Sequence, residues 1–175
     1  SLPGAIGIGL GGVAIAITSV IELLDEPDAL AAASSSLGLL CLPVMCFLAH
    51  CRRKGRSANV LLRGLVCVYL MLHLVCYYRL WSSDPQIQDY AFQLLAIVCL
   101  MLACYHRAAF DGDMGNRRGY VFFNLACVYF CLISLPGCEN MAFFLGVGCW
   151  MMTNLCSLLP LPRERKTGRF AKKHG

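Results

Sequence analysis

Long apolar stretches separated by short polar ones form the main pattern along this chain of 175 residues. The stretches are continuous rather than alternating, which favours helices over the strands of a membrane barrel. A bilayer core about 30 Å thick takes about 20 helical residues to cross. By that measure the pattern predicts six membrane spans, at 2–24, 29–50, 58–81, 87–105, 119–135 and 141–161.

These spans predict an all-α integral membrane protein with six transmembrane helices arranged as three hairpins. One transmembrane domain would then cover 1–161, and a basic tail would cover 162–175. The second span is the weakest of the six, because three serines at 34–36 and Pro43 interrupt it. Such interruptions are tolerated where neighbouring helices satisfy the freed backbone groups.

The composition agrees with this prediction. Hydrophobic residues make up 58% of the chain and charged residues 14%, whereas soluble domains carry about 25% charged residues. The charges are clustered between the spans, so no stretch is left over for a separate soluble domain.

The positions of Lys and Arg predict the orientation, because short cytoplasmic loops collect basic residues. With six spans, fourteen of the fifteen fall on one side and Arg79 falls on the other. We therefore expect both termini in the cytoplasm and a location in the cell membrane. Arg63 and Arg79, near opposite ends of the third span, are interpreted as headgroup anchors.

The basic side should contact anionic lipid headgroups or a docking partner. The residues expected to do so are Arg52, Arg53, Lys54, Arg56, Arg117, Arg118, Arg165, Lys166, Lys172 and Lys173. The bias also accounts for the net charge of +5, so no nucleic-acid partner is expected.

The glycine-rich stretch "GIGLGG" at 7–12 has the G-x-G-x-x-G spacing of a dinucleotide-binding loop. That site requires a preceding strand, and the stretch lies inside an apolar span, where a pyrophosphate would be at membrane depth. Small residues four apart instead favour close helix packing. The first helix should pack tightly or face another membrane protein, through Gly4, Gly7, Gly11, Ala14, Ala29 and Ala33.

Small residues at 29–36 also resemble the cleavage site of a secretory signal. No basic segment precedes the first apolar run, as such a signal requires. Retention of the first span is the preferred interpretation. Cleavage near Ala33, which would remove that span, is the alternative.

Twelve cysteines raise the question of a metal or redox site. No C-x-x-C and no zinc spacing of Cys and His occurs, so no metal and no cofactor is expected. Most of the cysteines lie inside spans, where they act as small apolar packing residues. Cys138 lies in an outward loop, and its partner in any disulfide would be Cys76.

Polar residues inside the spans are the strongest candidates for a site, since burying them costs free energy. Two hypotheses remain open: one shared polar cavity, or separate hydrogen bonds between helices. The residues concerned are Tyr69, His73, Tyr77, Gln93, Asn124, Thr153, Asn154 and Ser157.

Motifs for a membrane metalloprotease or a serine hydrolase do not occur, and the only acids within the spans are Glu22 and, at the start of the fourth span, Asp89. We therefore expect no enzyme. The preferred function is a non-catalytic membrane component that acts in assembly, anchoring or regulation through helix packing and basic loops. The alternative is the substrate-binding subunit of a small-molecule transporter that needs a separate energising partner.

Overall fold

The computed structural model describes residues 2–25, 28–54, 59–82, 87–111, 115–138 and 140–157, and all its regular elements are helical. Arg56, part of the sixth predicted span and the whole basic tail lie outside these ranges. The helices are α1 (Leu2–Leu24), α2 (Ala29–Arg53), α3 (Val60–Trp81), α4 (Ile87–Asp111), α5 (Arg117–Ser134), the 3₁₀ turn η1 (Leu135–Gly137) and α6 (Met141–Cys156).

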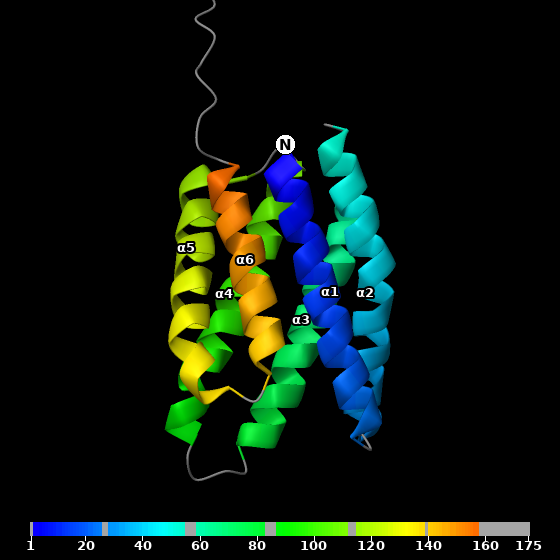
Figure 1. The fold of residues 1–175 in the computed structure, drawn as a ribbon, viewed down its shortest axis with the longest axis vertical. Helices are drawn as coiled ribbons and strands as arrows, with labels where there is room; N and C mark the ends of the chain where they lie inside the picture. Colours follow the sequence, from blue (N-terminus) through cyan, green and yellow to red (C-terminus); the bar gives the residue numbers. More distant parts are fainter. Residues whose placement is uncertain are drawn as a thin grey trace, which may run out of the picture.

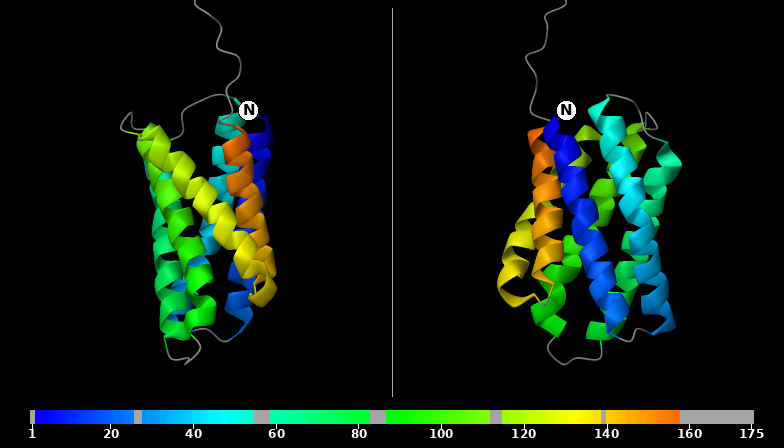
Figure 2. Two further views of the ribbon diagram at one scale, coloured as in Figure 1. Left: turned by 90° about the vertical axis from the view of Figure 1, so that its left-hand side faces the viewer. Right: turned by 45° about the vertical axis from the view of Figure 1, so that its right-hand side comes forward.

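The six α-helices form a bundle in which each packs on its neighbours in sequence and α6 closes against α1. Successive helices run in opposite directions, as Figure 1 shows. α5 runs obliquely and bridges α4 and α6 (Figure 2). The start of α1 and the end of α6 therefore lie at one end of the bundle, which we call the basic end; the opposite end is the far end.

Five helices, α1 to α5, are long and apolar enough to cross a membrane. α6 is apolar but has 16 residues within the described part of the chain. On the outside of the bundle every helix exposes large apolar side chains, among them Leu10, Leu40, Met71, Leu125 and Leu145. A surface of this kind suits contact with lipid, so the chain has the architecture of a multi-pass membrane protein.

α2 is one continuous helix that includes the three serines and Pro43. Ser34 and Ser35 are buried, whereas Pro43 is exposed on the outer surface. α4 continues six residues past the predicted boundary at 105, because helical structure does not stop where the apolar run gives way to polar residues. Asn59 and Asn116 cap α3 and α5, since their side chains accept hydrogen bonds from the backbone N–H groups of Leu61 and Arg118.

The glycines of α1 allow close contact with α6 and α2 of the same chain. Gly7 lies against Thr153, and a Cβ atom at Gly11 would lie 2.7 Å from the ring of Trp150. On α6, Gly146 faces Ala14. The small-residue face of α1 is thus occupied within the bundle. Ala29 and Ala33, which were expected to extend that face, are exposed.

Candidate functional site

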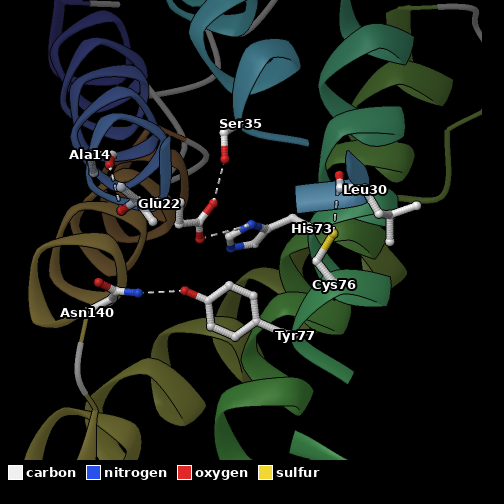
Figure 3. Close-up of polar contacts among 9 residues, drawn as sticks. Ala14, Glu22, Leu30, Ser35, His73, Cys76, Tyr77 and Asn140 are labelled. Carbon is white, nitrogen blue, oxygen red and sulfur yellow. Dashed lines mark hydrogen bonds and ion pairs between the residues drawn. The ribbon is translucent and has the colours of Figure 1, made fainter. Parts of the chain in front are cut away.

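Polar side chains between the middle of the bundle and its far end form one group, which we call the Glu22 cluster: Glu22, Ser35, Tyr69, His73, Tyr77 and Asn140. The Glu22 carboxylate accepts a hydrogen bond from the Ser35 hydroxyl at 3.1 Å, and its other oxygen lies 3.8 Å from Nδ1 of His73 (Figure 3). Asn140 donates to the Tyr77 hydroxyl at 2.5 Å. These contacts connect α1, α2 and α3 with the start of α6.

His73 is the centre of this cluster and is 1% exposed. Its ring packs against three aromatic rings, with centroid distances of 5.4 Å to Tyr69, 4.5 Å to Tyr77 and 5.1 Å to Phe143. The 3.8 Å separation from Glu22 is longer than a hydrogen bond. Aromatic packing therefore positions His73 more firmly than the carboxylate does.

A second polar group lies at the basic end, around a cavity of about 20 Å³ that has room for about one water molecule. We call it the arginine cavity. Arg52 of α2, Arg63 of α3 and Arg107 of α4 line it. α5 and α6 complete its wall with Tyr120, Asn124, Trp150 and Asn154.

Hydrogen bonds to α6 fix the position of Arg52. Its guanidinium donates to Asn154 Oδ1 at 2.7 Å and to Ser157 Oγ at 2.6 Å. Gly4 provides the space for this arrangement, because a Cβ atom there would lie 2.6 Å from the Arg52 Nε. Contacts from α1 and α6 therefore position the guanidinium of Arg52, which is on α2.

Several residues that line the arginine cavity carry a buried polar atom that has no hydrogen-bond partner in the described part of the chain. These atoms include Nε of Arg107, Nε1 of Trp150 and Oδ1 of Asn124. The amide nitrogen of Asn124 donates to the backbone carbonyl of Tyr120 at 2.7 Å. Arg107 also lies over the Tyr120 ring, with its Cζ 5.9 Å from the ring centroid.

The eight predicted cavity residues thus fall into different places. Tyr69, His73 and Tyr77 belong to the Glu22 cluster, whereas Asn124 and Asn154 line the arginine cavity. Ser157 contacts that cavity through Arg52. The other two bond elsewhere: Gln93 donates to the Gly137 carbonyl at 3.3 Å, and Thr153 to the Trp150 carbonyl at 2.8 Å.

The residues predicted to contact headgroups or a docking partner also lie in different environments. Arg53, Lys54, Arg117 and Arg118 are exposed at the basic end, but Arg52 bonds inside the bundle. Arg56, Arg165, Lys166, Lys172 and Lys173 lie outside the described residues.

Sequence reasoning did not identify Arg63, Arg107, Tyr120 or Trp150 as cavity residues. Arg63 was interpreted as an anchor, but its side chain lines the cavity. The available signal was the placement of Arg63 and Arg107 inside helices, each about one turn from a helix end. An arginine in that position either extends to the headgroups or turns inward, and the sequence alone does not distinguish the two.

All twelve cysteines are free thiols, including Cys76 and Cys138. Cys127 and Cys131 meet with their sulfurs 4.0 Å apart in the core. Among the described residues, no group of three or more metal-ligating side chains is found. No family model, curated protein or solved structure matches the chain.

Proposed function

We propose that this protein is a non-catalytic component of the cell membrane, with both termini in the cytoplasm, that acts in assembly, anchoring or regulation. The observation that carries the proposal is how the polar groups within its helices and at their ends are used. The side chains of Ser35, Gln93, Asn140 and Arg52 all donate to groups on other elements of the same chain. Hydrogen bonds of this kind hold a bundle together.

The exposed basic residues support the same proposal. Arg53, Lys54, Arg117 and Arg118 all lie at the basic end, and each can contribute about 1 kcal/mol of attraction near an anionic leaflet. This end would contact cytoplasmic partners or headgroups, while the apolar outer surface is available to lipid or to helices of a larger complex.

The second candidate function is a substrate-binding subunit of a transporter, which the arginine cavity favours. Native mass spectrometry of the full chain purified in lipid nanodiscs separates the two. For the non-catalytic component we expect a membrane complex without a stoichiometric metabolite. A co-purifying ATPase together with a small molecule that is lost in Asn154→Ala would contradict that proposal and support the transport function.

A further inference from the structure

Glu22 of α1 and His73 of α3 face each other inside the Glu22 cluster (Figure 3). Oε1 of Glu22 and both ring nitrogens of His73 are buried and have no hydrogen-bond partner in the described part of the chain. Oε1 lies 3.8 Å from Nδ1, so a movement of roughly 1 Å would give the length of about 2.9 Å that is usual for a charged hydrogen bond. The two side chains are therefore placed to share a proton.

The charge of the pair favours that proton. The carboxylate receives a hydrogen bond from Ser35 at 3.1 Å and also interacts with the Tyr77 hydroxyl, and both of these donors are neutral. Among the described residues, His73 is the basic side chain within ion-pair distance of Glu22. A desolvated carboxylate without a counter-charge costs free energy. One added proton removes the net charge, either as imidazolium beside carboxylate or as carboxylic acid beside imidazole.

The other groups around the pair do not exchange protons in the same pH range. Thiols and phenols normally lose their protons near pH 8.5 and 10, and arginine stays charged throughout. α6 faces the cluster with Asn140 and Phe143, which do not titrate. Between about pH 5 and 8, proton exchange in the cluster therefore falls to Glu22 and His73. The remaining titratable or charged side chains around them are Cys41 of α2 and Tyr69, Cys76, Tyr77 and Arg79 of α3.

The two members of the pair differ in access. His73 is 1% exposed and is enclosed by aromatic rings, whereas the Glu22 side chain is 22% exposed. Glu22 lies two residues before the end of α1 and His73 lies eight residues before the end of α3. At 1.5 Å per residue these positions are about 3 Å and about 12 Å from the helix ends. A proton from the far end thus reaches His73 by way of Glu22.

We propose that Glu22 and His73 together bind one exchangeable proton, which makes the pair a proton-binding site that opens to the far end. Two groups this close take up a proton as one unit, so the proton belongs to the pair. When bound, it joins α1 to α3 by a hydrogen bond, and its loss leaves a negative charge between these helices. This inference does not depend on which of the two functions above is correct.

Nuclear magnetic resonance of the imidazole nitrogens tests the site directly. The full chain is labelled with ¹⁵N-histidine and placed in phosphatidylcholine nanodiscs. The chain has four histidines, so the single variants His50→Gln, His106→Gln and His174→Gln identify three signals and leave the fourth to His73. We expect the Nδ1 signal of His73 to change between about pH 5 and 8 in a single one-proton transition.

Glu22→Gln provides the decisive comparison, because glutamine still offers Ser35 an acceptor but cannot exchange a proton. The His73 transition should disappear, since a buried imidazolium without a counter-charge is costly. Asp25→Asn, which removes an exposed carboxylate three residues further on, should leave the transition unchanged. A constant His73 signal in the parent protein, or the same transition in Glu22→Gln, would overturn the proposal.

Stability gives a second readout with a defined sign. At neutral pH the folded chain holds a proton that the unfolded chain has released, so the free energy of unfolding should fall as pH rises from about 6 to 8. Glu22→Gln should flatten this dependence, and Asp25→Asn should retain it. Sodium or potassium chloride at constant pH, with choline chloride as the reference, should not change the His73 signal. A change specific to sodium or potassium would identify a metal-cation site and would contradict proton binding.

Discussion

Gly9 and Gly11 stand two residues apart on α1 but have different surroundings. A Cβ atom at Gly11 would lie 2.7 Å from the Trp150 ring, whereas at Gly9 it would meet nothing within 4 Å. We expect Gly11→Ala to lower the free energy of unfolding by about 1–3 kcal/mol, because it overpacks the α1–α6 contact. Gly9→Ala should be neutral or stabilising by up to about 1 kcal/mol, since alanine favours helix.

Unfolding of both variants in mixed detergent micelles, followed by circular dichroism, measures this difference. Loss of stability in Gly9→Ala equal to that in Gly11→Ala would show that α1 does not pack on α6 as described. If neither variant loses stability, the conclusion is again that α1 does not pack on α6 as described.

Two neighbouring serines test the Glu22 cluster in a similar way. The Ser35 hydroxyl is buried and donates to Glu22 across the α1–α2 contact, whereas exposed Ser36 bonds to Ala33 of its own helix. Ser35→Ala should cost about 1 kcal/mol of stability, and Ser36→Ala less than about 0.5 kcal/mol.

A double-mutant cycle of Ser35→Ala with Glu22→Gln, measured by the same unfolding assay, tests the pairing itself. The two changes should be non-additive, because both weaken one hydrogen bond. Fully additive effects would place the cost of Ser35→Ala in some contact other than Glu22.

The sequence was informative about which polar residues matter but not about how they combine. Spacing placed Tyr69, His73 and Tyr77 on one helix face, and they do share a cluster. It did not predict that Glu22 would join them while Asn124 and Asn154 line a cavity with three arginines. Helical periodicity defines a face of each helix, whereas the rotation of that face toward its neighbours depends on packing among all six helices.

At the level of the helices, the N-cap of α5 offers a direct test. The Asn116 side chain accepts a hydrogen bond from the Arg118 backbone N–H at 3.1 Å. Asn116→Ala should lower the free energy of unfolding by about 1 kcal/mol, whereas Asn116→Ser should retain most of the stability because serine is also a good N-cap. Thermal unfolding of the two variants in one detergent compares them, and an equal loss in both would mean that the cap does not stabilise α5.

Helix positions were predictable because continuous apolar length is a strong signal, and α1 covers the predicted 2–24. The ends were less predictable. α4 extends beyond its apolar run, and α2 is not broken at Pro43, since a proline on an exposed face leaves the packed side of the helix intact. Closure of the bundle by α6 on α1 connects segments too far apart in sequence for local patterns to reveal.

For the whole molecule, the separation of basic residues predicts the orientation in the membrane. α6 is the critical element, because its 16 residues rise only about 24 Å, less than the roughly 30 Å of a bilayer core. If it crosses, a green fluorescent protein fused after Gly175 should fluoresce in the cytoplasm. Alkaline phosphatase should be active when inserted between Ser82 and Ile87 or between Gly137 and Asn140, and inactive when inserted between Asp111 and Gly115. Replacing the four basic residues at 52–54 and 56 with Gln should reduce the fraction with this orientation, since these charges favour the cytoplasmic side. If the green fluorescent protein after Gly175 is dark while alkaline phosphatase between Gly137 and Asn140 is active, both positions lie on the same, outer side of the membrane. In that case α6 does not cross and the chain has five spans.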